Sequence, residues 1–171
     1  MKTYFFTLLI ITLSLGAFAQ KKLLIYNFSS YNVNVGLIQT KHTTNAYPNV
    51  NASPSILIPA LGGSFELYTG HTTRFPFNAP DPLALPPYLI PTWGVQTAAT
   101  TYITMSANLA ALGYGPDQVF HFIKYDDGSG SGNLGTSPMG TSPVVLTDTT
   151  GYYDEFLTGG VIEYTLVIVD N

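Results

Sequence analysis

The alternation of apolar and polar residues at every second position constrains this chain more than any other feature. The segment Tyr31 to Leu37 alternates without interruption, and Phe65 to Tyr68 repeats the pattern. A period of two places successive side chains on opposite faces of a β-strand. Similar short runs recur between clusters of glycine, proline and asparagine. We therefore expect about eight or nine strands, over residues 22–28, 31–37, 55–58, 65–68, 101–105, 119–125, 143–147, 153–157 and 161–169.

Many short strands separated by turns predict an all-β fold, an antiparallel β-sandwich of immunoglobulin-like or jelly-roll type. One short crossover helix is expected over residues 106–113, because Ser106 is a typical N-terminal cap and Gly113 a typical stop. The alternative is an eight-stranded outer-membrane barrel. Such barrels have strands of about ten residues with an apolar outer face, and the shorter runs here favour the sandwich.

The first 19 residues have the pattern of a secretory signal peptide. Lys2 precedes an apolar run, and Ala17-Phe18-Ala19 matches the small-residue cleavage pattern. The run is too short to cross a hydrocarbon core of about 30 Å, so no transmembrane span is expected. The leader resembles those of secreted bacterial proteins of the Bacteroidota. We expect one domain, residues 20–171, exported to the periplasm, the cell surface or the medium.

Charged residues make up only 9% of the chain, against about 25% in an average globular protein. The 6 basic residues face 10 acidic ones, which argues against a nucleic-acid partner. The absence of cysteine excludes disulfides, thiol catalysis and zinc fingers. Because charges are depleted and tyrosine is enriched in the cores of protein interfaces, this composition favours a surface that binds another protein.

A proline-rich strap is expected over residues 75–93, where six prolines alternate with apolar residues. Prolines at this density oppose a central strand and favour extended structure. One interpretation is a loop that covers an open end of the core. The other is a rigid partner-binding surface, whose residues would be Phe75, Phe77, Tyr88, Leu89 and Trp93.

A second loop, rich in glycine and serine, is expected over residues 126–142. Asp126, Asp127 and Asn133 provide oxygen ligands of the kind that Ca²⁺ prefers. Their spacing differs from that of the known calcium loop, and a polar hairpin tip is the simpler interpretation. Calcium is therefore the alternative interpretation of this loop, and no other cofactor or metal is expected.

The chain has three histidines, His42, His71 and His121, and none has the spacing of a zinc site. A period of two gives His121 the same face as Ile123 and Tyr125, and we expect a core or edge histidine with one hydrogen bond. No serine lies in the strand–turn–helix context of a nucleophile elbow.

The leading functional hypothesis is a non-enzymatic structural or interaction subunit of a cell-surface or periplasmic assembly. Its partner would be another protein, a second copy of itself, or an outer-membrane or surface complex. The first alternative is a carbohydrate-binding module that stacks a glycan on Trp93, Tyr114, Tyr152 and Tyr153. The second alternative is a hydrolase whose site gathers His42, His71 and acids of the C-terminal part.

Overall fold

The computed structural model describes residues 20–68, 75–77 and 90–171. These residues form twelve strands, one α-helix and one 3₁₀ helix. The expected signal peptide lies outside them. The helices are α2 (Ala107–Tyr114) and η1 (Gly115–Asp117), and the strands are β1 (Gln20–Asn27), β2 (Val33–His42), β3 (Asn49–Ala52), β4 (Ile56–Ile58), β5 (Gly63–Tyr68), β6 (Thr92–Ala98), β7 (Thr101–Ser106), β8 (Gln118–Asp126), β9 (Ser131–Gly135), β10 (Val144–Val145), β11 (Thr149–Thr158) and β12 (Val161–Asp170).

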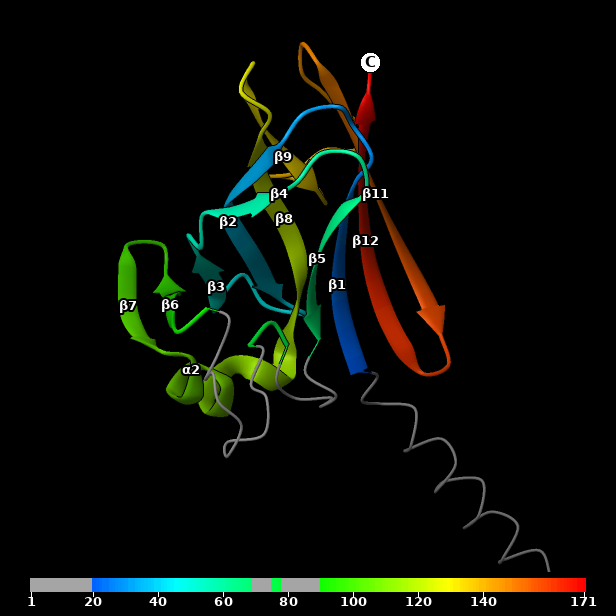
Figure 1. Ribbon diagram of the computed structural model, residues 1–171. Helices are drawn as coiled ribbons and strands as arrows, with labels where there is room; N and C mark the ends of the chain where they lie inside the picture. The colour runs from blue at the N-terminus through cyan, green and yellow to red at the C-terminus, as the bar shows by residue number, and fades with distance from the viewer. Residues whose placement is uncertain (1–19, 69–74, 78–89) are drawn as a thin grey trace, which may run out of the picture.

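The strands form two sheets that lie against each other (Figure 1). Sheet A has five strands in the order β10–β11–β12–β1–β5. Sheet B has seven, in the order β7–β6–β3–β2–β8–β9, with β4 also paired to β2. The first and last strands, β1 and β12, pair in parallel, and the other strand pairs are antiparallel. The predicted all-β sandwich is confirmed, with twelve described strands rather than eight or nine.

The core lies between the two sheets. In sheet A, Leu23 and Ile25 of β1 and Leu166 and Ile168 of β12 have no exposed surface. Burying one such side chain contributes about 1.5–3 kcal/mol, so the fold has a substantial core although it has no cysteine. Sheet B supplies the facing residues, among them Val33, Val35, Ile38, Val50, Val95 and Ile123.

Strand β2 departs from the alternation that its sequence predicts. Val33 and Val35 are fully buried, as expected. The pairing with β8 then shifts register between Val35 and Leu37, which leaves Gly36 as an extra residue. Because such a β-bulge adds one residue to the strand, the side chains beyond it that would have faced outward now face the core. Ile38 is consequently the next fully buried side chain, and the prediction of unbroken alternation is wrong at Leu37.

Helix α2 follows β7 and packs below the end of sheet B (Figure 1). Ala107, Ala110 and Ala111 form its buried face, at the spacing of one face of a helix. Ser106 occupies the N-cap position as predicted, although its side chain makes no capping hydrogen bond. In the described part of the chain, no helix combines the length and the apolar character needed to cross a membrane.

Candidate functional site

The residues predicted as a partner surface lie mostly in the core. Phe75 and Phe77 have no exposed surface, and Trp93 is 1% exposed. The rings of Phe77 and Trp93 meet edge to face at 5.1 Å. A contact surface built on these three side chains is therefore incorrect. Phe75 and Phe77 belong to the core, and Trp93 belongs to it as a residue of strand β6. Tyr88 and Leu89 lie outside the described residues.

The aromatic set predicted to bind a glycan is not gathered in one place. Trp93 is buried and has no face free for a sugar. Tyr152 and Tyr153 lie in β11 rather than in a loop, and the ring of Tyr153 stacks on Phe120 at 5.3 Å. Of this pair, Tyr152 presents the larger aromatic surface, at 49% exposed. A glycan platform made of these residues is not supported by the fold.

The residues proposed for a hydrolase are also dispersed. His42 ends β2 in sheet B, and its Nε2 lies 3.8 Å from a carboxylate oxygen of Asp117. Asp154 and Glu155 lie on β11 in sheet A, and His71 lies outside the described residues. The described part of the chain thus does not assemble this site.

The calcium candidate Asp127 is occupied by hydrogen bonds of its own turn. One oxygen accepts the backbone N–H groups of Ser129 (2.9 Å) and Gly130 (3.2 Å) and the Ser129 hydroxyl (2.7 Å). The other accepts the hydroxyl of Thr149 at 2.8 Å. Burial alone raises the pKa of Asp127, but these hydrogen bonds outweigh it and hold the pKa below its ordinary value.

The other calcium candidates point to the same structural role. Asp126 accepts the backbone N–H of Gly128 at 2.8 Å, and Asn133 donates to the carbonyl of Met139 at 3.1 Å. Residues 131–135 of the predicted loop form strand β9. No group of three histidines and acids suited to a metal occurs among the described residues. Calcium binding stays a prediction. In the structure, the hydrogen bonds that Asp127 accepts from Ser129 and Gly130 stabilise the turn between β8 and β9.

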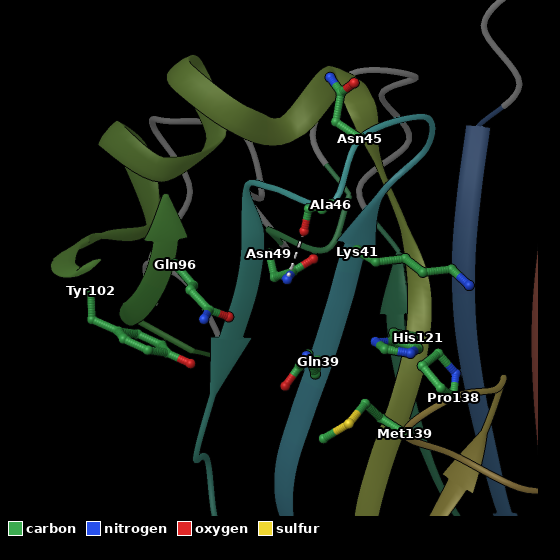
Figure 2. A pocket seen from close by; sticks show the side chains of 10 residues that line it. All are labelled: Gln39, Lys41, Asn45, Ala46, Asn49, Gln96, Tyr102, His121, Pro138 and Met139. Carbon is green, nitrogen blue, oxygen red and sulfur yellow. Dashed lines mark hydrogen bonds between the residues drawn. The ribbon is translucent and has the colours of Figure 1, made fainter. Parts of the chain in front are cut away.

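A cavity of about 500 Å³ lies on the outer face of sheet B, away from sheet A (Figure 2). Its volume is in the range of cavities that bind small ligands. Side chains from five adjacent strands and from two loops line it. In order across the sheet they are Tyr102 (β7), Gln96 (β6), Asn49 (β3), Gln39 and Lys41 (β2) and His121 (β8), with Asn45, Ala46, Pro138 and Met139 from the loops.

A second β-bulge turns His121 toward this cavity. Gln39 of β2 pairs with Phe122 and Thr40 with Phe120, so His121 is the extra residue of β8. Beyond the bulge the next side chain that faces the core is that of Ile123, which is fully buried. The predicted shared face of His121 and Ile123 is therefore wrong, because the prediction assumed an uninterrupted period of two.

His121 is buried without a hydrogen-bond partner. Its side chain is 6% exposed, and neither Nδ1 nor Nε2 has a partner in the described part of the chain. The predicted single hydrogen bond is thus absent. Burial, and then the positive charge of Lys41, hold the pKa of His121 below its ordinary value. The neutral imidazole that results has one N–H donor and one acceptor, and neither is used by these residues.

The loop from Gly135 to Thr141 is fixed against the backbone of His121. The carbonyl of His121 accepts the backbone N–H of Thr136 at 2.7 Å and its hydroxyl at 3.2 Å. A Cβ at Gly135, whose φ is +152°, would lie 2.3 Å from that carbonyl oxygen. Only glycine permits this close approach, which brings Pro138 and Met139 to the wall of the cavity (Figure 2).

The side-chain amides of the cavity retain hydrogen-bonding capacity. Asn49 donates to the carbonyl of Ala46 at 3.1 Å, and Gln96 donates to that of Ala99 at 3.2 Å. In each case the amide oxygen has no partner among the described residues, and Gln39 has none for either amide atom. Tyr102 adds an aromatic ring that is 61% exposed. The surface therefore combines unused donors and acceptors with one aromatic face.

Strand β7 gives the molecule a second unusual surface. Sheet edges are commonly protected from other strands by charges or by short length. Edge strand β5 carries Glu66, and β11 carries Asp154 and Glu155 beside the two-residue strand β10. The edge strand β7 (Thr101–Ser106) has no charge and no proline, and no described strand pairs with its outer side.

Comparisons of the chain with protein-family models, with curated proteins and with solved structures found no match. The candidate site consequently stands on its geometry. Sequence reasoning missed Gln39, Lys41, Gln96 and Tyr102, since single polar residues on strands carry no motif. Alternation alone can place such residues on an outer face, but only the strand order brings them together.

Proposed function

We propose that this protein is a non-enzymatic carbohydrate-binding protein whose ligand lies in the cavity on sheet B. The observation that supports the proposal is the convergence of side-chain amides, one exposed tyrosine and an unpartnered histidine on one cavity. Amides both donate and accept hydrogen bonds, as sugar hydroxyls require. An exposed aromatic ring offers an apolar face against which a sugar ring can pack.

Binding without catalysis fits the chemistry of the lining. Glycoside hydrolysis commonly needs two carboxyl groups on either side of the scissile bond. No aspartate or glutamate lines the cavity among the described residues. Neither ring nitrogen of His121 has a hydrogen-bond partner in the part of the chain that the structure describes, so no acid there orients it as a general base. The proposed function is therefore the carbohydrate-binding alternative that the sequence suggested. Its site consists of cavity residues rather than of Trp93 and the predicted loop tyrosines.

The span of the site suits an oligosaccharide. Tyr102 and His121 lie on strands separated by four strand spacings, β7–β6–β3–β2–β8. At the usual spacing of neighbouring strands this distance is about 19 Å. A ligand that touches both ends is longer than a single sugar ring, so we expect short oligosaccharides to bind better than monosaccharides.

Substitution of a matched pair of tyrosines tests the proposal. Tyr102 on sheet B and Tyr152 on sheet A are both exposed, at 61% and 49%. We expect Tyr102→Ala to weaken binding of an oligosaccharide selected on a glycan array by about tenfold, equivalent to about 1.4 kcal/mol. Tyr152→Ala should leave the affinity unchanged. Isothermal titration calorimetry of the three proteins measures the difference.

Two results would contradict the proposal. One is the absence of any glycan that binds at millimolar concentration. The other is a loss of affinity in Tyr152→Ala with none in Tyr102→Ala, which would place the site on sheet A. Circular dichroism of each variant confirms that the sandwich is intact.

A second candidate function, an interaction subunit, is favoured by the uncharged edge of β7. Two copies can pair antiparallel through this strand in a two-fold contact, in which the same strand of each copy faces the other. Like charges on β7 would repel each other across such a contact, and β7 has no charged residue. Ile103 is 44% exposed on this edge. We expect a dimer in sedimentation equilibrium at micromolar concentration and a monomer for Ile103→Lys; a monomeric unmodified protein would contradict this candidate.

A further inference from the structure

The cavity on sheet B has a neutral end and a cationic end. Tyr102, Gln96 and Asn49 lie toward β7, whereas Lys41 and His121 lie toward β8 (Figure 2). The side chain of Lys41 runs from β2 across β8, above His121. A ligand that matches both ends carries hydroxyl groups at one end and a negative charge at the other.

Lys41 is available to such a charge. Its Nζ donates to the hydroxyl of Thr136 at 3.2 Å. No carboxylate among the described residues lies within ion-pair distance of this ammonium; the ion pairs observed there join Lys22 to Glu163 and His42 to Asp117. An ammonium group has three donors, so two remain for a ligand.

The charge of the cavity is opposite to that of the chain. The chain has 10 acidic and 6 basic residues, a net charge of −4. The described lining nevertheless has one lysine and no acid. A positive cavity in an acidic protein gives a local attraction for anions that the rest of the surface does not offer.

His121 is the second group at this end. It is 6% exposed and has no partner for either ring nitrogen. A buried polar group without a partner costs free energy, and native structures have few of them. The neighbouring Met139 is 54% exposed, and a methionine side chain moves easily between rotamers. A ligand oxygen could accept the imidazole N–H once a neighbouring side chain such as Met139 has moved aside.

We propose that the ligand is an acidic oligosaccharide whose carboxylate is held by Lys41 and His121 at the β8 end of the cavity. The proposal rests on the proposed function and adds the chemical class of the sugar. The amides and Tyr102 hold the neutral sugar units, and Lys41 selects the unit that bears a carboxylate, as found in uronic acids.

Matched ligands test the inference. Oligosaccharides that contain glucuronic or galacturonic acid are titrated beside the same chains with each carboxyl reduced to an alcohol. We expect the acidic member of a pair to bind at least tenfold more tightly at low salt. This preference should fall as the salt concentration rises, because salt screens an exposed ion pair.

Variants assign the preference to one residue. Lys41→Gln should bind the acidic and the reduced member equally, and Lys41→Arg should keep the preference. Lys124→Gln is the control, because it removes the same charge from an exposed position of β8 that does not line the cavity. Circular dichroism establishes that each variant is folded.

The outcomes separate the two proposals. Equal binding of acidic and reduced oligosaccharides, weakened in both by Tyr102→Ala, overturns the inference and leaves the proposed function. Binding of no oligosaccharide overturns both. An acidic preference that Lys124→Gln removes as fully as Lys41→Gln overturns the inference, since overall charge would then account for it. A preference for sulfated over carboxylated chains overturns the assignment to carboxylate.

Discussion

The turn that closes β8 and the cavity beside β8 contain two polar side chains that are equally buried. Asp127 and His121 are each 6% exposed. Asp127 accepts four hydrogen bonds from the residues of its turn and from Thr149. His121 has none. Two side chains only six positions apart in the sequence thus differ sharply: one has a full set of hydrogen-bond partners and the other has none among the described residues.

The difference separates structural from functional use of a polar residue. A buried carboxylate with every partner in place holds its neighbours in one arrangement, and its removal leaves their donors unpaired. A buried imidazole without hydrogen-bond partners fixes no polar neighbour in this way. Unsatisfied buried groups are rare in native proteins, and the imidazole of His121, unpartnered among the described residues, is the observation on which the proposed ligand contact rests.

The pKa directions agree with this distinction. Hydrogen bonds lower the pKa of Asp127 despite its burial, so the fold favours the charged carboxylate. Burial lowers the pKa of His121, and Lys41 adds to the effect, so the fold favours the neutral imidazole. The turn therefore stabilises the charged form of Asp127, whereas the surroundings of His121 disfavour its charged form.

Removal of Asp127 gives the largest expected effect. Asp127→Ala leaves the hydroxyl of Thr149 and the N–H groups of Ser129 and Gly130 without their acceptor. Hydrogen bonds to a charged group contribute about 1.5–3 kcal/mol, so we expect the free energy of unfolding to fall by about 3 kcal/mol. Urea denaturation measures this loss as a lower transition midpoint.

Asp126→Ala is the matched control. Asp126 is exposed and its side chain accepts one hydrogen bond, from the backbone N–H of Gly128. We expect a loss below about 1 kcal/mol. Equal losses of unfolding free energy in the two variants would mean that the hydrogen bonds of Asp127 contribute little to stability. The claim that Asp127, unlike His121, has a structural role would then fail.

The fold could be predicted from the sequence further than the site could. Apolar runs located the strands β1 and β12, because hydrophobic residues dominate both segments. Sequence patterns missed β3 (Asn49–Ala52), β6 and β9, which are short or interrupted by glycine. The proline count predicted a strap over residues 75–93, most of which lies outside the described residues, and it could not tell that Phe75 and Phe77 are buried.

The site depends on features with no local signature. His121 reaches the cavity because β8 has one residue more than β2 in their pairing, and a bulge follows from tertiary register rather than from residue type. Tyr102 and Gln96 join Gln39 only because β3 and β6 lie between β2 and β7. The missed strands and the unforeseen bulge in β8 are thus the reasons that the site was missed.

Replacement of His121 gives the smallest expected effect and tests the other side of the comparison. His121→Leu removes a buried polar group that has no partner, which is neutral or stabilising when the shape is kept. At pH 7.5 we therefore expect a free energy of unfolding within about 1 kcal/mol of the unmodified protein. Urea denaturation at a series of pH values then reveals the role of the proton.

The sign of the pH dependence follows from the lowered pKa. Below the ordinary value of 6.5, the unfolded chain takes up a proton on His121, whereas the folded chain resists it until its own lower pKa is reached. Stability is thus fully present above pH 6.5 and decreases as the pH falls below it. His121→Leu and His121→Gln should both lose this component of the slope between pH 7 and pH 5.5. If both variants keep the slope of the unmodified protein, the imidazole is not held neutral, and the contrast with Asp127 fails at the cavity.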